Sequence, residues 1–462
     1  MRAHWKIGRT VTHTVTRTVT HTVTRTVTWM AAVVAGTSCG SEPDVAAPRA
    51  AASTARELAA SPSVDPHAAH GAEPKTLYVW ASDVAHRAPD FLAVIDFDRT
   101  SPSYGKVLRT VPLPPPGNVG NEPHHCHTSA DETILACGGL LSVLKGQNDI
   151  FFFDIRDARS PRFLSSTRAP GSSVTDDFLA LPGGGFLVTN MGSATGGPGG
   201  RVVEVDANRR VVAEYPATSP ADGRFNPHGM DADFARNRLV TSDFINPAST
   251  LAAYPGAPEL RSSVRFWDLG ARRITRTVVL PDAAGTMDVK LLPGDEHGRA
   301  VTANMFTGRF YTVDPTTGGY VQSFDAATVT PHVEARVRGG LPGLLAVPPG
   351  SRRLIFATMA AGQVVLLDTT NPADFRQLSV VSLGTDAGPH SVHLTHDGRR
   401  LVVTDYFLDE DGAGKIHLDG DHKVRVLEVG DRSLAVDAAF RVVDFDTAFP
   451  TGPARPHGIG MK

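Results

Sequence analysis

One pattern of apolar and polar positions recurs along the chain from residue 76 onward. A short apolar run ends at an acidic residue, and a polar turn and a second apolar run follow it. Runs of this length separated by turns predict β-hairpins. The pattern occurs in seven segments, LAVIDFD, IFFFDIRD, VVEVDAN, VRFWDLG, FYTVDPT, VVLLDTT and VRVLEVG, with acidic residues Asp96, Asp154, Asp206, Asp268, Asp314, Asp368 and Glu428. Their spacing of 46 to 62 residues predicts seven repeats of one unit.

A second hairpin precedes most of these segments, as in PHSVHLTHDGRRLVVTD and PHGMDADFARNRLVTSD, so each repeat has about four strands. Four-stranded sheets at this period are typical of a β-propeller, in which each blade covers the apolar face of the next. We therefore predict an all-β fold, with residues 75–462 forming one seven-bladed β-propeller. The run TLYVWASD lacks an inner partner and the C-terminal PHGIG lacks a blade, so pairing of residues 456–460 with residues 76–82 is expected to close the ring.

The N-terminal residues do not follow this pattern. Residues 10–28 are a low-complexity repeat, and the run WMAAVVAGTSC after it resembles a bacterial secretory signal that ends at the acylated cysteine of a lipoprotein. The residues before Cys39 are Gly-Thr-Ser, where such signals prefer Leu-Ala-Gly. We expect residues 1–39 to be a leader with lipid attached at Cys39, and residues 40–74, rich in Ala, Pro and Ser, to be a disordered tether. This predicts a bacterial protein in the periplasm or on the outer surface.

Charge and cysteine content narrow the functions further. The chain has 45 Lys and Arg against 48 Asp and Glu, a net charge of -3, so nucleic acid is not an expected partner. Besides Cys39 it contains Cys126 and Cys137. An exported protein can join these two in a disulfide. A hairpin that turns at SADE, residues 129–132, would place Cys126 opposite Leu135, which argues against that bridge.

Histidines recur at the start of the predicted blades. Four blades begin with the dipeptide Pro-His, at His124, His228, His390 and His457. The first strand of a propeller blade lines the central channel, so these four imidazoles are expected to meet on the axis although they are far apart in the sequence. A single histidine at this position is as well explained by a hydrogen bond to the neighbouring blade, but four in register favour a metal site.

His125 follows His124 and joins the candidate set. Two neighbours on one strand can share an ion only where the strand is irregular, because successive side chains point to opposite faces. Imidazoles without a thiolate cluster suit copper, iron or zinc. We predict that the metal ligands are His124, His125, His228, His390 and His457. Residues close to them that could orient or join the ligands are Asp176, Asp177, Asp288 and Cys126; for the aspartates, a solvated channel rim is the alternative. By strand alternation His127 should point away from the axis, and His393 lies further along its strand.

Two further segments look like connections. GSATGGPGG at residues 192–200 lacks the Lys and the helix of a phosphate-binding loop and is expected to be a turn. The acidic segment 409–423 misses the spacing of a calcium loop and is expected to be a long hairpin over one face of the propeller.

The segment APDFLAVIDFDRTSPSYGKVLRTVPLPPP, followed by the pair His124 and His125, resembles the start of the selenium-binding protein family, which includes copper-dependent methanethiol oxidases. The likeness continues to the final ARPHGI. It implies a seven-bladed propeller, export in bacteria and oxidation of methanethiol by O2 and water to formaldehyde, hydrogen sulfide and hydrogen peroxide. His124, His125 and His457 match the family's copper histidines. A further family histidine would fall where this chain has Thr175 and Asp176.

Three functions follow as hypotheses. The first is an exported copper oxidase that acts on a small thiol, most simply methanethiol, with O2. The second is an oxygenase with a four-histidine iron site, like that of the carotenoid oxygenases, which are also seven-bladed. The third is a non-enzymatic copper- or selenium-binding propeller.

Overall fold

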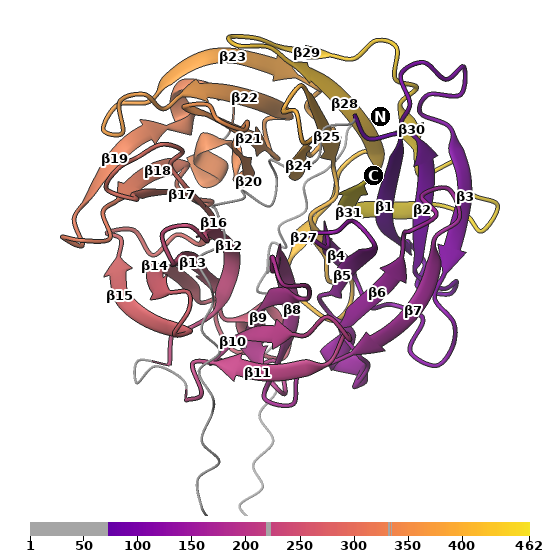
Figure 1. The fold of residues 1–462 in the computed structure, drawn as a ribbon, viewed down its shortest axis with the longest axis horizontal. Coiled ribbons are helices and arrows are strands. Elements are labelled where there is room, and N and C mark those ends of the chain that lie inside the picture. The colour runs from indigo at the N-terminus through magenta and orange to yellow at the C-terminus, as the bar shows by residue number, and fades with distance from the viewer. Residues whose placement is uncertain (1–72, 219–222, 331–332, 334) are drawn as a thin grey trace, which may run out of the picture. The chain divides into compact units, whose positions relative to one another are not determined.

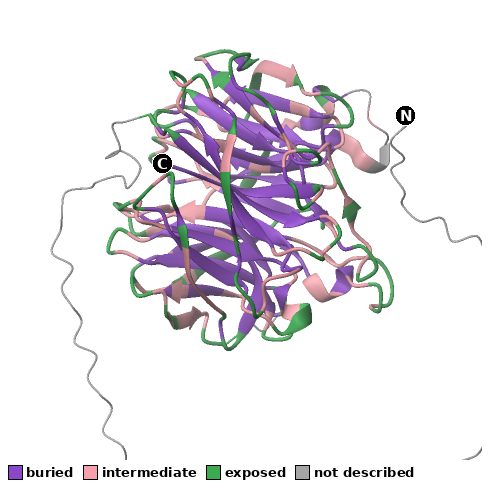
Figure 2. Ribbon diagram, turned by 90° about the vertical axis from the view of Figure 1, so that its right-hand side faces the viewer, coloured by how far each residue is buried: buried purple, intermediate pink, exposed green. Residues whose placement is uncertain are grey.

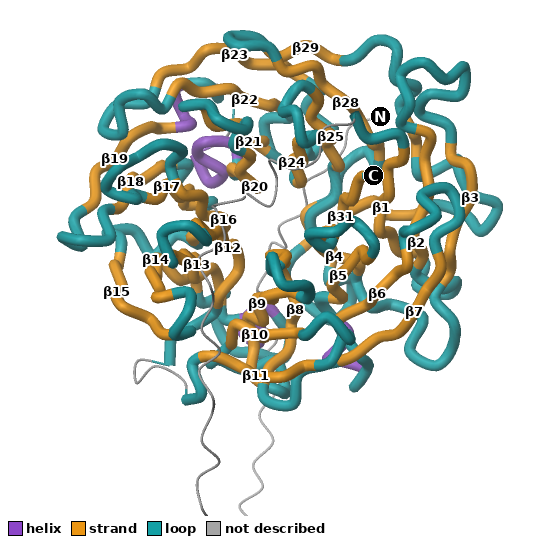
Figure 3. The backbone as a smooth tube through the Cα atoms, viewed as in Figure 1, coloured by secondary structure: helices purple, strands orange, loops and turns teal. Residues whose placement is uncertain are grey.

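The computed structural model describes residues 73–218, 223–330, 333 and 335–462. The described part of the chain is a ring of seven antiparallel sheets around a central channel, with strands, loops and a few short 3-10 turns (Figures 1 and 3). The predicted all-β, seven-bladed propeller is thereby confirmed. The predicted leader, its lipid site Cys39 and the tether up to residue 72 lie outside the described residues.

Each blade has four main strands, and we number the blades from the one that both chain ends build. The strands, from the channel outward, are β31 (Ala454–Met461), β1 (Thr76–Asp83), β2 (Phe91–Asp96) and β3 (Val107–Pro112) in blade 1; β4 (Pro123–Thr128), β5 (Ile134–Gly139), β6 (Ile150–Asp154) and β7 (Arg162–Thr167) in blade 2; β8 (Ser172–Ala180), β9 (Phe186–Ser193), β10 (Arg201–Val205) and β11 (Val211–Tyr215) in blade 3; and β12 (Pro227–Asp233), β13 (Arg238–Ile245), β14 (Leu260–Asp268) and β15 (Arg273–Val279) in blade 4.

The remaining strands are β16 (Thr286–Leu291), β17 (Ala300–Asn304), β18 (Arg309–Val313) and β19 (Tyr320–Asp325) in blade 5; β20 (Pro342–Ala346), β21 (Arg353–Thr358), β22 (Gln363–Asp368) and β23 (Arg376–Ser382) in blade 6; and β24 (Ser391–Leu394), β25 (Arg400–Thr404), β28 (Lys423–Val429), β29 (Leu434–Val436) and the short β30 (Val443–Asp444) in blade 7. Outside the blades are the hairpin β26 (Leu408–Asp409) and β27 (His417–Leu418) and the 3-10 turns η1 (Ser142–Lys145), η2 (Pro247–Thr250), η3 (Ala326–Thr328) and η4 (Ala335–Gly340).

The hydrophobic core lies between the blades. Side chains from the facing sheets of neighbouring blades form common clusters, such as Val79, Ala93 and Ile95 of blade 1 with Val402 and Val426 of blade 7. Figure 2 shows the strands buried along most of their length, with exposed residues mainly at turns. Because every blade face is covered by its neighbour, the apolar runs need no helices to bury them.

The two chain ends close the ring in blade 1. The C-terminal β31 pairs antiparallel with β1, with Tyr78 opposite Gly460 and Ala81 opposite Pro456, as expected from the sequence. The amides of Lys75 and Thr76 both donate to the carbonyl of Lys462, at 2.8 and 2.7 Å. In Figure 1 the first strand and the last strand accordingly lie side by side.

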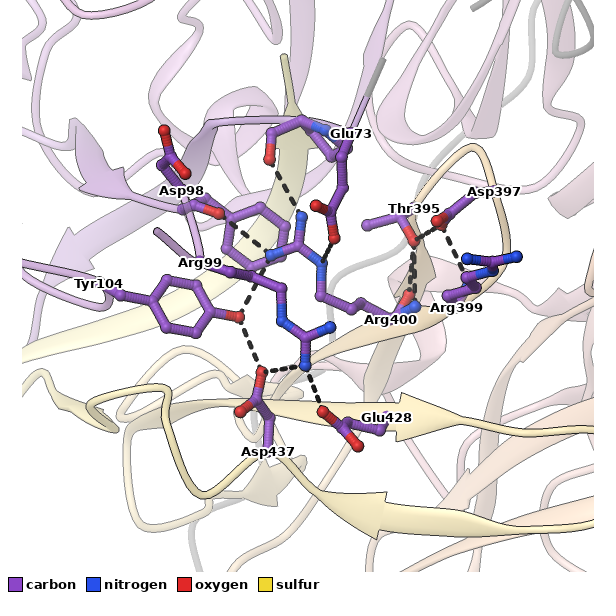
Figure 4. A network of polar contacts seen from close by, with 12 residues as sticks. Glu73, Asp98, Arg99, Tyr104, Thr395, Asp397, Arg399, Arg400, Glu428 and Asp437 are labelled. Carbon is purple, nitrogen blue, oxygen red and sulfur yellow. Dashed lines mark hydrogen bonds and ion pairs between the residues drawn. The ribbon is translucent and has the colours of Figure 1, made fainter. Parts of the chain in front are cut away.

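A buried arginine adds a second connection between the last blade and the first (Figure 4). The side chain of Arg400, on β25, is fully buried and lies over the ring of Phe97 at 3.9 Å. Its guanidinium donates to the carbonyls of Phe97 and Pro74, both at 3.0 Å. Tyr104, which also accepts a bond from Arg400, donates to Asp437 of blade 7 at 2.9 Å. Arg400 of blade 7 therefore binds the backbone on both sides of the first strands of blade 1, at Pro74 and Phe97.

The cysteine pairing differs from the expectation. Cys126 lies opposite Cys137, and the two form a disulfide between β4 and β5. The predicted turn was wrong by one residue: the amide of Ser129 donates to the carbonyl of Ile134, so the loop contains residues 130–133. The hydroxyl of Ser129 also accepts from the amide of Ile134 at 3.0 Å, which stabilises this shifted register.

Deletion of residues 454–462 is expected to abolish cooperative unfolding. The deletion removes the inner strand of blade 1 and exposes an apolar face on both neighbouring blades, so no closed ring remains. Differential scanning calorimetry of the full chain and the truncated chain would measure this. An unchanged melting temperature in the truncated protein would contradict the closure.

Candidate metal centre

The inner strands share an irregularity where they reach the channel. In β4, Pro123 pairs with Gly139 and Cys126 with Cys137, so His124 and His125 together face only one residue of β5. This is a β-bulge, which turns two successive side chains away from normal alternation. The same two-against-one register occurs in blades 3 to 6, at Asp176 and Asp177, His228 and Gly229, Met287 and Asp288, and Gly343 and Leu344.

Blade 1 has a related bulge on its inner strand, β31. Pro456 and Gly458 pair with the consecutive residues Ala81 and Trp80, which leaves His457 as the extra residue. In blade 7, His390 directly precedes β24, and its amide donates to the carbonyl of Thr404 at 2.9 Å. Each predicted ligand histidine therefore stands at or beside the point where an inner strand departs from regular pairing.

Hydroxyl groups on the second strands hold these irregular segments in place. Thr189 of blade 3 donates to the carbonyl of His228 in blade 4, at 2.6 Å. Thr404 of blade 7 donates to the carbonyl of His457 in blade 1, at 2.9 Å. The backbone under each of these histidines is thus fixed by the blade before it.

The structure brings all five predicted ligand histidines together. Ring centroids are 4.3 Å apart for His124 and His125, 4.1 Å for His124 and His457, and 5.1 Å for His390 and His457. His228 lies 5.7 Å from His125 and 6.4 Å from His124. All five side chains are buried. Residues from four blades therefore form one cluster on the axis.

Asp176, from the bulge of blade 3, is a carboxylate within this cluster. Its oxygens lie 3.0 Å from Nδ1 of His125, 3.2 Å from Nε2 of His124 and 3.3 Å from Nε2 of His228. Burial favours its neutral form, but the three imidazoles outweigh this and hold the pKa of Asp176 well below its usual range. An ionised carboxylate in this place both orients imidazoles and is itself a donor for a metal.

Most of the clustered imidazoles are neutral, and most of their ring nitrogens lack a hydrogen-bond partner among the described residues. Burial lowers the pKa of His124 and of His228 to about 4. Burial also disfavours the charged form of His125, but Asp176 opposes it and raises the pKa of His125. Among the described residues, no hydrogen-bond partner exists for either ring nitrogen of His390 and His457, for Nδ1 of His124, for Nε2 of His125 or for Nδ1 of His228. Nε2 of His124 has only its contact with Asp176.

Buried polar atoms without partners are costly, so this many in one place indicates a ligand. Two groups of three residues could each hold a metal ion, because the donor atoms within each group all lie within 4.8 Å of one another. One group is His124, His125 and His457, and the other is His124, Asp176 and His228. Imidazole nitrogens with one carboxylate oxygen fit copper, iron or zinc. The residues present therefore fit the metal that the sequence suggested, and ligation itself stays a prediction.

Two of the predicted supporting aspartates tie blades together. Asp177 accepts a hydrogen bond from the amide of Met230 in blade 4, at 3.0 Å, and Asp288 accepts one from Leu345 in blade 6, at 2.8 Å. Asp288 also contacts the ammonium of Lys290 at 3.0 Å. Burial raises the pKa of Asp177 to about 6, although Lys290 opposes this. Both side chains line the channel beside the histidines, and neither belongs to the two donor sets.

Cys126, the remaining predicted supporting residue, belongs to the hydrophobic core between blades 1 and 2, with its sulfur in the disulfide. A Cβ atom on Gly458 would lie 2.7 Å from that sulfur and 2.2 Å from the carbonyl oxygen of His124. Glycine is therefore required next to His457, because β31 passes so close to β4.

A buried group that sequence analysis missed borders the cluster. The hydroxyl of Tyr406 donates to the carboxylate of Glu122, and the Tyr406 ring lies 5.6 Å from that of His457. Arg455 lies over the Tyr406 ring at 5.3 Å. Burial raises the pKa of Glu122 to about 8, which the bond from Tyr406 opposes. The signal was in the sequence: Glu122 and Arg455 stand directly before Pro123 and Pro456 of two Pro-His pairs.

A cavity opens on each side of the histidines. The wide one, of about 660 Å³, is lined by His125 and His228 together with Asp177, Asp288 and Lys290. His127 and His393 line it too, with ring centroids 6.3 Å apart. The expectation that His127 points away from the channel was wrong, because the bulge turns His125 inward and His127 follows it two residues later. A small cavity, of about 50 Å³, reaches His124, Asp176 and His228 from the opposite side.

The fold and the site define a seven-bladed β-propeller with a buried histidine cluster on its axis. A family model described as 56 kDa selenium-binding protein matches residues 60–462, so the chain belongs to the selenium-binding protein family. Methanethiol oxidases of Xenopus laevis and Rattus norvegicus are 22% and 23% identical to it over 449 residues, which are 80% of this chain and 89% of each relative. Selenium-binding protein 2 of Mus musculus is 23% identical with the same coverage.

Solved structures show the same fold. A selenium-binding protein from Sulfolobus tokodaii superposes with a TM-score of 0.71 at 16% identity, covering 86% of this chain and 97% of the other. A periplasmic gluconolactonase from Pseudomonas aeruginosa has a TM-score of 0.55 at 14% identity, covering 84% and 98%. In the described residues, no helix is long and apolar enough to cross a membrane.

Metal content is expected to depend on the clustered histidines. Full-length protein loaded with copper and then dialysed should hold about one ion per chain, because the two donor sets share His124. His124→Ala should lose the ion, whereas Asp176→Asn should lower copper affinity by about 10- to 100-fold. Elemental analysis and competition with a copper chelator would measure both.

The matched control is His393→Ala, which removes an imidazole from the wide cavity but not from either donor set. It should retain copper, and all variants should keep the far-ultraviolet spectrum of a folded propeller. Retention of full copper by His228→Ala and His457→Ala together would refute the axial site.

Proposed function

We propose that this protein is an exported copper-dependent oxidase of a small thiol, with methanethiol as the simplest substrate. The observation that carries the proposal is the cluster of five buried imidazoles, most of whose ring nitrogens lack a hydrogen-bond partner among the described residues. Two further facts support it: the chain belongs to the selenium-binding protein family, and several of its relatives are named methanethiol oxidase.

The proposed reaction balances without another reactant. One methanethiol, one O2 and one water give one formaldehyde, one hydrogen sulfide and one hydrogen peroxide. The carbon loses two electrons and O2 gains them. Copper, when bound, supplies one-electron chemistry between Cu(I) and Cu(II) and a Lewis acid for a sulfur ligand.

The protein's own residues would hold the ion, orient the ligating rings and exclude water from the site. His124, His125 and His457 would hold the ion, with His228 and His390 completing the set. Asp176 fixes the orientation of three of these rings. Phe244 packs against His228 at 5.0 Å and Phe407 against His390 at 4.7 Å. These apolar rings exclude water from the side of the small cavity.

A second candidate is an oxygenase with a histidine-ligated iron. His228 and His390 favour it, because they extend the three histidines that match the family's copper set to a larger set of imidazoles. The third function, a copper or selenium carrier without catalysis, is supported by the family name alone. Metal analysis distinguishes these functions: iron in protein purified from its own host would favour the second.

Export to an oxidising compartment is part of the proposal. The Cys126–Cys137 bridge supports it, because disulfides persist mainly outside the cytosol. The proposed lipid anchor at Cys39 and the bacterial origin rest on the leader sequence.

Copper-loaded protein is expected to consume methanethiol and O2 and to produce hydrogen peroxide in equal amounts. His124→Ala should reduce this rate by at least about 100-fold, since it removes the donor common to both ligand sets. An oxygen electrode and a peroxide assay would follow the reaction. Loss of peroxide production in His393→Ala to the same extent would contradict the assignment of the axial histidines.

Cys39→Ser is expected to move the protein from the membrane fraction to the soluble periplasmic fraction, because the lipid chains would be its anchor. Fractionation of bacteria that express the full chain, followed by immunoblotting, would measure this. An unchanged membrane share in the variant would exclude lipidation at Cys39.

A further inference from the structure

The small cavity has walls of a different chemistry from the wide one. At one end it reaches His124, Asp176 and His228 of the axial cluster. The side chains that line the rest of it are almost entirely aliphatic and aromatic. Apolar side chains of four blades meet there, including Val143, Met191, Phe244 and Phe407. The wide cavity instead presents Asp177, Asp288 and Lys290. We call the small cavity the chamber.

The hairpin β26–β27 forms part of the chamber roof. It leaves blade 7 and contributes Leu408 and Ile416 to the lining. It is attached to the connection between β13 and β14 in blade 4, since the amide of Lys415 donates to the carbonyl of Thr250 at 2.8 Å. The ammonium of Lys415 donates to the carbonyls of Ser249, Tyr254 and Gly256, at 3.0, 2.8 and 2.9 Å. These hydrogen bonds therefore attach the hairpin, which leaves blade 7, to blade 4 on the other side of the channel.

A buried carboxylate stiffens the same hairpin. Glu410 accepts from the amides of Lys415 and Ile416, at 2.9 and 3.1 Å, and from the hydroxyl of Thr250. The backbone that positions Ile416 over the chamber is thus bonded at three points. A wall held this firmly can set the size of what it encloses.

The volume limits the occupant. The chamber measures about 50 Å³. An apolar protein cavity of about 150 Å³ holds benzene, which has six heavy atoms, so by proportion the chamber holds roughly two. The alkyl groups of methanethiol and ethanethiol have one and two carbon atoms, so they fit the chamber when the sulfur points out of it toward the histidines. The wide cavity, at about 660 Å³ and with charged walls, has neither the size nor the polarity to select such a molecule.

We infer that the chamber is the thiol-binding subsite and that it admits alkanethiols of one or two carbons, with the alkyl group against the apolar roof and the sulfur toward His124 and His228. This inference rests on the proposed thiol oxidation. To the wide cavity, with its charged walls, we assign the entry of water and the exit of the polar products. Substrate size is selected by the loops above the ring, and the inner strands hold the metal.

Three variants of the full-length protein test the inference. Ile416→Ala enlarges the roof, Ala248→Leu fills the chamber, and Leu291→Ala, a half-buried aliphatic residue of the wide cavity, is the matched control. The first readout is kcat/KM of copper-loaded protein for methanethiol, ethanethiol, propanethiol and butanethiol. The second is xenon binding to copper-free protein, followed by xenon NMR, with methanethiol added as a competitor.

The wild type should lose about tenfold in kcat/KM for each methylene beyond ethanethiol. Ile416→Ala should gain about tenfold on propanethiol and little on methanethiol. Ala248→Leu should raise the KM for methanethiol with copper content unchanged and should abolish xenon binding, and Leu291→Ala should match the wild type in both readouts. A chain-length profile that responds to Leu291→Ala and not to Ile416→Ala would overturn the inference.

The competition experiment separates this inference from the proposed function. If methanethiol displaces xenon from the copper-free wild type but is not oxidised by the loaded protein, the chamber assignment stands and the oxidase proposal fails. If the loaded protein oxidises methanethiol but the thiol does not displace xenon, the chamber assignment fails and the oxidase proposal stands.

Discussion

Antiparallel pairing of β31 with β1 is the interaction on which the rest of the structure depends. A propeller blade has no core of its own, because its apolar faces are covered only by its neighbours. Blade 1 is completed by eight C-terminal residues, and Trp80, on the paired strand β1, donates to the carbonyl of Gly138 in blade 2 at 2.8 Å. Arg400 joins blade 7 to the same region. The closure thus connects three consecutive blades as well as two strands.

The axial cluster lowers the conformational stability of the protein. Regular inner strands would pair every residue and turn alternate side chains away from the channel. Instead, bulges turn His124 and His125 the same way, and buried ring nitrogens stay without partners. Arrangements that are locally unfavourable persist when the surrounding structure determines them. Here the threonines of the second strands and the cross-blade aspartates do so, since they bond the bulged backbone from the neighbouring blade.

The sequence was sufficient for the fold and for the identity of the clustered histidines. Apolar runs with acidic ends marked the blades, and the Pro-His pairs marked inner strands, because both signals repeat in register. Asp176 was predicted only as one of four residues that could orient or join the ligands, since nothing local to TDD shows that it would face three imidazoles. The orientation of His127 was missed because a bulge changes the alternation of side chains, and the pairing of Cys126 was missed because the turn lies one residue further along the chain than predicted. Single residues of this kind carry no periodic signal.

The position of His457 has a consequence for how the protein is made. Five residues follow it in the sequence, whereas His124 lies in the second blade to be synthesised. The set of His124, His125 and His457 cannot form before β31 has been synthesised, whereas the set of His124, Asp176 and His228 lies entirely in blades 2 to 4. A metal held by the set that includes His457 would therefore require the closed ring, and its binding could not guide the early steps of folding.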